Sequence, residues 1–293
     1  MCINNCFLGE DRHMKLGVVL DCLKIPLPEG IAFAGELKID GVQAYATSGA
    51  FSPDGLTESD KAYYKKILKD NGLVFSALCA DMGGFGFQIE KDNPDRIAKT
   101  KLIIDLAMEF GAKVITSHIG VIPSDKKELR YKIMLDALTE CGLYAKTKGI
   151  TMAIETGPET ANTLKAFLDD TKGGVGVNLD PANFVMVTDQ DPTEAVYILK
   201  DYIVHTHIKD GIMLKKTDPK VIYDYFAIGG IEGLNVMDYF KETPVGQGNV
   251  DFKSYLKALK EIGYEGYLTI ERECGDNPKE DMQLAIDYVS KFL

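Results

Sequence analysis

Four residues whose side chains commonly bind divalent cations are spread along the chain, each at the end of a short apolar run. They are Glu155 in TMAIETGP, Asp180 in VGVNLDPAN, His207 in IVHTHIKD and Glu271 in YLTIERE. Carboxylate oxygens neutralise the charge of a divalent cation, and one imidazole adds a ligand of borderline softness. If the fold brings the four side chains together, they suit one ion of the Mn²⁺, Mg²⁺, Co²⁺ or Zn²⁺ type. The residue types therefore predict a divalent metal ion as the cofactor.

Each apolar run that ends in one of these residues has the character of a buried strand. Eight runs of this kind occur, and they span residues 15–21, 41–47, 73–80, 112–120, 150–155, 174–180, 202–209 and 266–273. Their apolar, β-branched and glycine-bounded composition is typical of strands that are buried on both faces of a parallel sheet. Segments with helical periodicity lie between them, the clearest at residues 58–72, 94–111, 126–149, 191–201, 250–263 and 278–293.

This alternation of strands and helices predicts an α/β protein, a single-domain (β/α)₈ TIM barrel over residues 14–293. A doubly wound open sheet is the alternative, but it would bind its ligand at one switch point instead of drawing ligands from four separate strands. In a barrel, alternate side chains of a strand point inward, which places His205, His207 and Lys209 on one inner face. Barrel enzymes carry their chemistry at the carboxyl ends of the strands. We expect the four candidate ligands to meet at that end.

The composition limits the partners and the location of the protein. The formal net charge of −11 at pH 7 repels phosphate backbones and anionic membranes, so we expect neither nucleic acid nor a membrane as a partner. The sequence contains no apolar run of about 18 residues, the length of a membrane-spanning helix. Its six cysteines lack metal-finger spacing, which is typical of reduced thiols in a cytoplasmic protein. Residues 1–13 lack the pattern of a secretory signal, and we expect them to form a disordered extension.

Five motifs occur in an order that resembles a known family. They read IETGPET, NLDPANF, HTHIKD, GQGNVDF and LTIERE. Together they resemble the xylose isomerase-like TIM barrel superfamily, and within it the sugar (and sugar-phosphate) isomerase/epimerase branch to which D-tagatose 3-epimerase belongs. Inosose dehydratase is a further relative. The resemblance extends from Met14 to Leu293 and implies that one metal ion is held by Glu155, Asp180, His207 and Glu271.

The resemblance also implies a chemistry for this site. A carbonyl oxygen and a neighbouring hydroxyl of a sugar can chelate the cation, which then stabilises the enediolate formed when the adjacent C–H proton leaves. One carboxylate takes that proton, and a second carboxylate on the other face of the substrate can return one. Glu155 and Glu271 come from well-separated strands, so they are the expected catalytic pair as well as metal ligands.

Three further residues are candidates for contacts with the substrate. His118 in TSHIG points inward, so it is expected to touch the substrate or a metal ligand, with a core histidine as the alternative. Asn183 stands where some relatives carry a histidine and can form a hydrogen bond with a sugar hydroxyl. Lys209 can polarise a carbonyl or neutralise an oxyanion, or it is a solvated residue of the rim. We expect His205 to lie deeper in the barrel and Arg272, whose phase is opposite to that of Glu271, to brace the barrel.

The segment of residues 210–250 departs from the compact repeat and is rich in aromatic residues and glycine. Connections of more than about 12–15 residues in compact domains are commonly lids or binding elements. We therefore expect a lid that selects the substrate, while a contact in a homo-oligomer would use the same aromatic side chains.

Glu159 precedes a helix, where it either binds a hydroxyl or stabilises the helix start.

The functions that remain differ in the step after proton removal. A metal-dependent sugar isomerase or epimerase is the main prediction, and a sugar or cyclitol dehydratase would use the same enediolate and expel a hydroxyl. A phosphodiesterase like endonuclease IV needs more histidines than the four in this chain, and a non-catalytic sugar-binding barrel is a further alternative. The chain has only four arginines, which slightly favours a sugar without a phosphate over a sugar phosphate.

Overall fold

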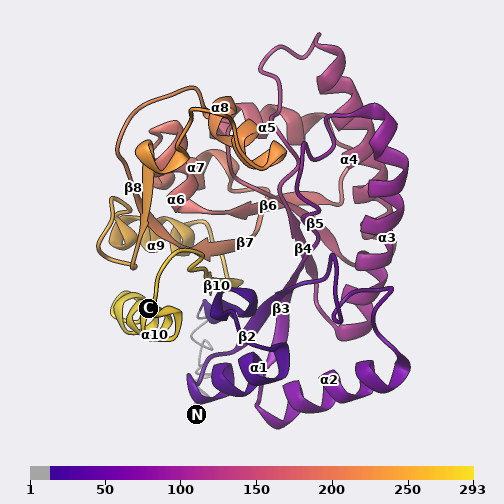
Figure 1. Ribbon diagram of the computed structural model, residues 1–293, viewed down its shortest axis with the longest axis vertical. Helices are drawn as coiled ribbons and strands as arrows, with labels where there is room; N and C mark the ends of the chain where they lie inside the picture. Colours follow the sequence, from indigo (N-terminus) through magenta and orange to yellow (C-terminus); the bar gives the residue numbers. More distant parts are fainter. Residues whose placement is uncertain (1–13) are drawn as a thin grey trace, which may run out of the picture.

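Eight parallel strands close into a barrel in the computed structural model, which describes residues 14–293 (Figure 1). Around the barrel the strands follow the order β1-β10-β7-β6-β5-β4-β3-β2. Their bounds are β1 Lys15–Val19, β2 Gly41–Tyr45, β3 Val74–Cys79, β4 Val114–Ser117, β5 Thr151–Glu155, β6 Val175–Leu179, β7 Ile203–Ile208 and β10 Tyr267–Ile270. The predicted (β/α)₈ barrel is confirmed, and each predicted strand is present. The expected extension at residues 1–13 lies outside the described residues.

Helices cover the outside of the barrel, and α2, α3 and α4 follow one another along the right of Figure 1. The helices are α1 Leu27–Glu36, α2 Glu58–Asp70, α3 Asn93–Phe110, α4 Leu129–Thr147, α5 Ala161–Asp170, α6 Pro181–Asn183, α7 Pro192–Leu199, α8 Pro219–Ile228, α9 Phe252–Glu261 and α10 Pro278–Val289. Six of them fall on the segments predicted from helical periodicity, whereas α1, α5, α6 and α8 were not predicted. Helix α1 contains Pro28, Gly30 and Gly35, residues that weaken a helical pattern.

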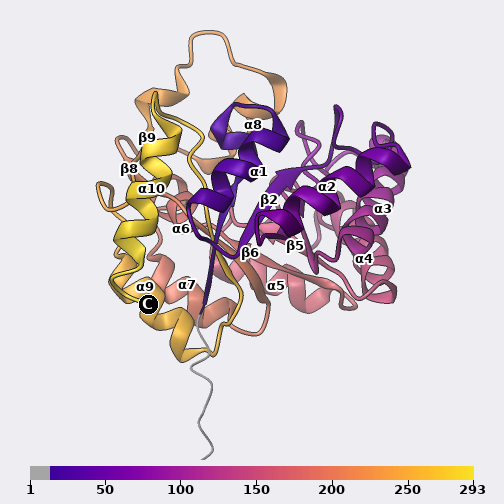
Figure 2. The same ribbon diagram turned by 90° about the horizontal axis from the view of Figure 1, so that it is seen from below.

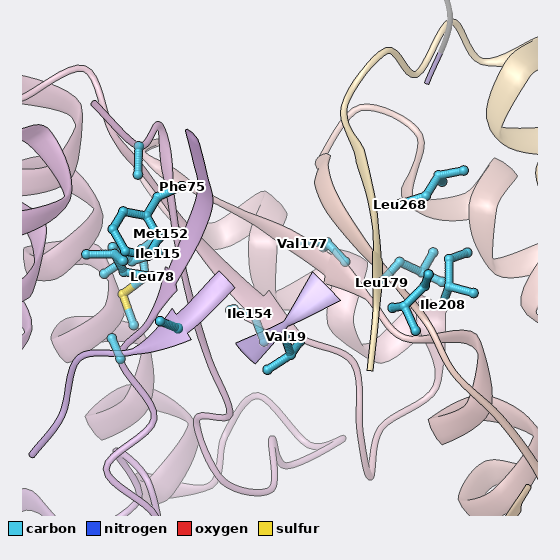
Figure 3. Packing of buried hydrophobic residues seen from close by; sticks show 14 of the residues in the cluster. Val19, Phe75, Leu78, Ile115, Met152, Ile154, Val177, Leu179, Ile208 and Leu268 are labelled. Carbon is cyan, nitrogen blue, oxygen red and sulfur yellow. The ribbon is translucent and has the colours of Figure 1, made fainter. Parts of the chain in front are cut away.

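The main hydrophobic core lies between the strands and the surrounding helices. Figure 3 shows aliphatic side chains of this layer, including Ile115, Met152, Ile154 and Val177, all of which are fully buried. They belong to one cluster that also contains buried helix residues such as Leu138. Each aliphatic side chain of this size contributes about 1.5–3 kcal/mol when it is removed from water. This layer fixes the barrel, so the opposite faces of the same strands are free to carry polar groups.

The interior of the barrel is polar near its centre. His205 is 1% exposed, and its Nδ1 lies 2.9 Å from Asn178 Oδ1 while its Nε2 lies 3.0 Å from Thr269 Oγ1. Both ring nitrogens therefore have a partner, as buried polar groups generally do. Burial holds the pKa of His205 well below its usual value. This position agrees with the expectation that His205 lies deep in the barrel.

The segment expected to be a lid contains regular structure of its own. Strand β8 (Asp210–Met213) pairs antiparallel with β9 (Phe240–Thr243), and α8 lies between them in the sequence. Helix α8 and its flanking loops lie at the top of Figure 2, away from α7 and α9 at the bottom. Ile222 of α8 and Val236 pack with Ala182, Met186 and Val187, which follow β6. The segment is therefore anchored to the barrel at the connection that follows Asp180.

Asp210 holds the return from this segment in place. Its carboxylate accepts hydrogen bonds from the backbone N–H groups of Gly246, Gly248 and Val250, at 2.9, 2.9 and 3.1 Å. A side chain at Gly248 would place its Cβ 2.1 Å from Asp210 Oδ1. The GQG turn thus uses a glycine because the carboxylate occupies the space of a side chain.

In the part of the chain that the structure describes, no helix combines the length and the apolar character needed to cross a membrane.

Candidate metal centre and its cavity

The four candidate ligands converge at the carboxyl ends of β5, β6, β7 and β10. Each of Glu155, Asp180, His207 and Glu271 offers one ligand atom, and these atoms all lie within 4.8 Å of one another. His207 Nδ1 lies 3.5 Å from Glu155 Oε1, 3.9 Å from Asp180 Oδ2 and 3.3 Å from Glu271 Oε2. Two ligands that are each about 2.1 Å from one ion lie roughly 3–4 Å apart. The spacing around His207 therefore fits a single ion.

The local structure at Asp180 leaves one oxygen free for a cation. Asp180 caps α6, and its Oδ1 accepts hydrogen bonds from the backbone N–H groups of Ala182 and Asn183 at 2.7 and 3.2 Å. Its Oδ2 is buried and has no hydrogen-bond partner. Leaving a buried carboxylate oxygen without a partner is costly. A cation held between the four side chains would satisfy this oxygen, so the residues fit the metal that their types predict.

The orientation of His207 is set by a residue from the opposite part of the barrel. His207 Nε2 lies 3.2 Å from the side-chain oxygen of Gln43 on β2. That oxygen can only accept a hydrogen bond, so it favours a proton on Nε2 and leaves Nδ1 as the ring nitrogen that a cation can use. Asn178 Nδ2 lies 3.2 Å from the same Nε2 atom. Gln43 Nε2 in turn donates to Thr116 Oγ1 at 3.3 Å. The imidazole therefore presents Nδ1 toward the three carboxylates.

Glu271 is held by a buried lysine. Lys209 Nζ donates to Glu271 Oε2 at 2.9 Å and also binds Glu273, while Glu242 Oε2 lies 3.9 Å away. Burial alone would raise the pKa of Glu271, but the charges of His207 and Lys209 hold it well below its usual value. Glu271 is therefore ionised at neutral pH. Lys209 is buried and paired, so the alternative of a solvated rim residue is wrong.

Glu155 faces His118 on the other side of the site. His118 Nε2 lies 3.5 Å from Glu155 Oε1, and the His118 ring meets the Tyr223 ring edge-on with centroids 5.7 Å apart. Burial would raise the pKa of Glu155, but His118 and His207 lower it below its ordinary value. Asn178 Nδ2 donates to Glu155 Oε2 at 3.3 Å. His118 thus contacts a candidate ligand, and its contact with the substrate stays a prediction.

The four candidate ligands lie in or beside a cavity of about 380 Å³, which Glu155 and Glu271 help to line. His118, Asn183 and Lys209, the predicted substrate contacts, line the same cavity. Asn183 Nδ2 donates to the backbone carbonyl of Thr156 at 2.9 Å, which fixes the side chain in place. Small-molecule pockets typically measure ~300–1,000 Å³, so the cavity suits a small ligand.

Glu159 is a buried carboxylate close to this site. It is 6% exposed, and its Oε2 has no hydrogen-bond partner. Burial raises the pKa of Glu159 to about 7.

Nearby, a side chain at Gly157 would place its Cβ 2.5 Å from the Tyr223 hydroxyl. Because Gly157, in the turn after β5, has no side chain, the Tyr223 hydroxyl of α8 can pack against this turn.

Arg272 is not part of the cavity lining, and it braces the fold, as its phase predicts. Its guanidinium donates to Glu242 Oε1 at 2.5 Å and to Asp281 Oδ2 at 2.7 Å. These bonds join β9 of the lid segment to α10. Arg272 also places Glu242 next to Lys209 in the network that holds Glu271.

Several residues of the site were missed by the sequence analysis: Gln43, Tyr45, Asp81, Tyr223 and Glu242. Gln43 is 1% exposed. Strand β2 reads GVQAY, so Gln43 is an amide among apolar residues that precede a terminal tyrosine. A lone amide in an otherwise apolar buried strand was the available signal. Tyr223 and Glu242 come from the lid segment, whose path the sequence did not reveal.

Comparisons with known proteins agree with this fold. Residues 31–292 match the family model described as "Xylose isomerase-like TIM barrel". An inosose dehydratase of Clostridium perfringens is 25% identical over 150 residues, which are 50% of this chain and 48% of that protein, so the match spans about half the relative's length. An inosose isomerase of Bacillus velezensis is 24% identical over 92% of this chain and 87% of that protein.

A solved structure extends the similarity over almost the whole chain. It is the xylose isomerase domain protein from Planctomyces limnophilus, which superposes with a TM-score of 0.76 at 25% identity and covers 96% of this chain and 97% of its own. The family model matches far more than half of the residues, and the structure has the closed parallel barrel that the family name describes. This chain belongs to the xylose isomerase-like TIM barrel family.

Proposed function

We propose that this protein is a divalent-metal-dependent sugar isomerase or epimerase that moves a proton at the carbon next to a ketose or aldose carbonyl. The observation that carries the proposal is the convergence of Glu155, Asp180, His207 and Glu271, with Asp180 Oδ2 buried and unpartnered. In this proposal all four residues are ligands of one Mn²⁺, Mg²⁺, Co²⁺ or Zn²⁺ ion. When bound, the cation supplies Lewis-acid stabilisation of the negative charge that develops on the substrate oxygens.

The two glutamates are the proposed catalytic residues. Strands β5 and β10 are separated by β6 and β7 around the barrel, so Glu155 and Glu271 approach the cavity from different sides. Both carboxyl groups have lowered pKa values, which keeps them ionised and able to accept a proton at neutral pH. One glutamate removes the proton from the substrate carbon, and the other takes up a proton from solvent and delivers it to the opposite face. This arrangement favours epimerisation.

Lys209 and His118 support the two glutamates. Lys209 donates to Glu271 Oε2 at 2.9 Å, so it keeps that carboxylate oriented and ionised. His118 lies 3.5 Å from Glu155 Oε1 and lines the cavity, which gives it access to a substrate hydroxyl. Asn183 lines the same wall and is the proposed third contact with the substrate.

The charges around the cavity favour a substrate without a phosphate group. Among the described residues that line it, Lys209 is the one lysine or arginine, and it is already paired with Glu271 and Glu273. Asp81, Glu155 and Asp224 add further negative charge to the lining. A phosphate would be repelled by these carboxylates. We therefore propose a neutral sugar as the small-molecule partner.

A dehydratase of a sugar or cyclitol is the second candidate function. The similarity to the inosose dehydratase of C. perfringens favours it. The first step would be the same proton removal, and the enediolate would then expel a neighbouring hydroxyl as water. The two functions differ in the mass of the product, because epimerisation conserves it and dehydration lowers it by one water.

A panel of ketoses, inososes and their phosphates, incubated with Mn²⁺-loaded protein and followed by NMR and mass spectrometry, tests the proposal. We expect at least one unphosphorylated compound to give an isomer of unchanged mass. Loss of water from the active compound would instead establish the dehydratase. Failure of every compound to exchange a carbon-bound proton in D₂O would contradict both.

A further inference from the structure

The lid segment brings one phenol group to the cavity of the candidate metal centre. Tyr223 belongs to α8 and lines this cavity together with Glu155 and Glu271. Its ring meets the His118 ring edge-on, with the centroids 5.7 Å apart, and His118 Nε2 lies 3.5 Å from Glu155 Oε1. Tyr223 therefore stands on the side of the cavity that holds Glu155, one of the two proposed catalytic residues.

The helix that carries Tyr223 fixes its position. Helix α8 begins after Asp218, whose side chain accepts the backbone N–H of Lys220 at 2.9 Å. The next residue along from the tyrosine toward the helix start, Ile222, is 3% exposed and packs in the cluster that contains Ala182. Tyr223 packs against the same cluster. An anchored donor needs no reorganisation when it forms a hydrogen bond in an active site, which is the condition for effective electrostatic stabilisation.

The turn after β5 leaves room for the tyrosine. A side chain at Gly157 would place its Cβ 2.5 Å from the Tyr223 hydroxyl and 2.8 Å from Tyr223 Cζ. Gly157 is not among the glycines that adopt a positive φ, so its backbone does not itself require glycine. The close approach of Tyr223 explains the glycine. This approach brings the hydroxyl to the turn that directly follows Glu155.

The Tyr223 hydroxyl keeps its proton and has no partner in the protein. Burial raises the pKa of Tyr223 well above its usual value, and the charges of Glu159, Glu155 and Asp180 raise it further. The phenol is therefore a hydrogen-bond donor at neutral pH. No hydrogen bond joins this hydroxyl to another residue between 14 and 293. A donor that lines a cavity without a protein partner is available to a ligand.

The proposed reaction needs a donor for an oxygen that becomes negative. Removal of a proton next to a carbonyl shifts negative charge onto the carbonyl oxygen, and Glu155, Asp180 and Glu271 already place three carboxylates at the site. Lys209, the one lysine or arginine among the described residues of the lining, is paired with Glu271. A neutral hydroxyl can stabilise the developing charge through a hydrogen bond, as donors of oxyanion holes do. Tyr223 supplies such a hydroxyl.

We propose that Tyr223 is a third catalytic residue, whose hydroxyl donates a hydrogen bond to the substrate oxygen that becomes negative when a glutamate removes the carbon-bound proton. This inference rests on the proposed function. Tyr223 keeps its own proton throughout, so proton transfer remains with Glu155 and Glu271. The lid segment thus takes part in the chemistry, beyond the selection of the substrate that is expected of it.

Binding of glycolohydroxamate, a small mimic of an enediolate, tests the proposal without turnover. Its two neighbouring oxygens resemble those of the enediolate, and it has no proton for the glutamates to transfer between faces. Calorimetric titration into Mn²⁺-loaded full-length protein should show binding about 10–100-fold weaker in Tyr223→Phe than in the wild type, because hydrogen bonds to charged groups have effects of this size. The substitution keeps the ring that contacts His118. Equal affinities of the two proteins would overturn the proposal.

Tyr225→Phe is the matched control. Tyr225 lies on the same helix and packs against the same cluster as Tyr223, but it is not part of the cavity lining. We expect this variant to bind glycolohydroxamate as the wild type does, and both variants to keep the wild-type Mn²⁺ dissociation constant and thermal midpoint. An equal loss of binding in the control, or a loss of Mn²⁺ affinity in Tyr223→Phe, would show that the substitution acts through the lid packing or the metal centre. Either result would overturn the proposal.

Turnover separates a catalytic role of Tyr223 from simple substrate binding. On the most active compound of the panel, Tyr223→Phe should lower kcat roughly 10²–10³-fold with little change in KM, because the hydrogen bond is stronger in the transition state than in the bound substrate. A raised KM with unchanged kcat would overturn the proposal. If the wild-type protein neither binds glycolohydroxamate nor turns over any compound, the proposed function itself is wrong. Wild-type turnover that Tyr223→Phe retains in full would overturn only the role of Tyr223.

Discussion

Gln43 on β2 contacts His207 on β7, and the Gln43 Oε1 and His207 Nε2 atoms lie 3.2 Å apart across the barrel. Because Gln43 Oε1 only accepts, it favours a proton on Nε2, and Nδ1 is the nitrogen that faces the cluster of carboxylates. Residues that orient a metal-binding histidine in this way typically change metal affinity about 10–100-fold when they are replaced. Gln43 is therefore part of the proposed metal site although it offers no ligand atom to it.

Replacing Gln43 with leucine should weaken metal binding while the barrel stays folded. Leucine has a similar size but cannot accept the Nε2 proton, so we expect the Mn²⁺ dissociation constant to rise about 10–100-fold. Titration with Mn²⁺ followed by EPR measures the change. Gln190→Leu is the control, because Gln190 Oε1 accepts the Ala161 N–H at 2.9 Å outside the cavity. An unchanged Mn²⁺ affinity in Gln43→Leu would mean that Gln43 does not orient His207.

Asp180→Asn should abolish tight metal binding. The oxygen of the new amide can keep the hydrogen bonds with Ala182 and Asn183, but its nitrogen would then replace the free Oδ2 and present protons to the cation. Wild-type protein should lose thermal stability on chelation, because a cation at ~1,000 times its dissociation constant stabilises the native state by about 4 kcal/mol. The variant should show no such loss, as followed by calorimetry with and without EDTA.

Asp191→Asn provides a matched control for that experiment. Asp191 also caps a helix that begins with proline, and its side chain accepts the N–H of Thr193. It does not line the cavity of the candidate metal centre. We expect it to keep full metal content by elemental analysis. Full metal content in Asp180→Asn as well would refute the assignment of Asp180 as a ligand.

The stability of the protein should decrease between about pH 5 and pH 8 because of Glu159. Burial raises its pKa to about 7 in the native state, whereas an unfolded glutamate titrates near ~4.3. The native state therefore binds more protons in this interval, and the free energy of unfolding falls as the pH rises. The loss attributable to Glu159 is on the order of 3 kcal/mol, at ~1.4 kcal/mol per unit of pKa difference.

Glu159→Gln removes this contribution and leaves the other titrating groups in place. Urea unfolding at pH 5 and pH 8 should show a smaller loss of stability for the variant than for the wild type. The difference in pH dependence between the two proteins isolates the contribution of Glu159, because the carboxylates of the metal centre titrate in both. Parallel pH dependences in the variant and the wild type would show that Glu159 is not protonated in the native state.

The strands that hold the site were predictable because each ends in a residue that interrupts an apolar run. Glu155, Asp180, His207 and Glu271 stand at such ends, and the repeating pattern predicts that the ends lie together. The predicted boundaries were less accurate. The predicted run of residues 112–120 is longer than β4, which spans Val114–Ser117. The run does end at the turn of Gly120, which has a φ of 92°, but hydrophobicity does not show where the strand pairing stops within it.

The contacts around the site were not predictable in the same way. Gln43 reaches His207 across the barrel, and the distance in sequence between them is 164 residues. Tyr223 reaches His118 only because β8 and β9 pair and return the lid segment over the cavity. The sequence predicted a lid in residues 210–250 but contained no pattern strong enough to reveal α8, whose residues PKVIYDYFAI combine helical and strand-forming types.

Deuterium incorporation from D₂O, followed by NMR on a substrate found in the panel, tests the central claim most directly. The Mn²⁺-loaded wild-type protein should incorporate deuterium at the carbon next to the carbonyl and invert it. Glu155→Gln and Glu271→Gln should each lose roughly 10²–10⁴-fold in turnover, because each removes one acid or base. Each variant should still exchange the proton on the face of its remaining glutamate, without inversion. Wild-type turnover in either variant would contradict the account.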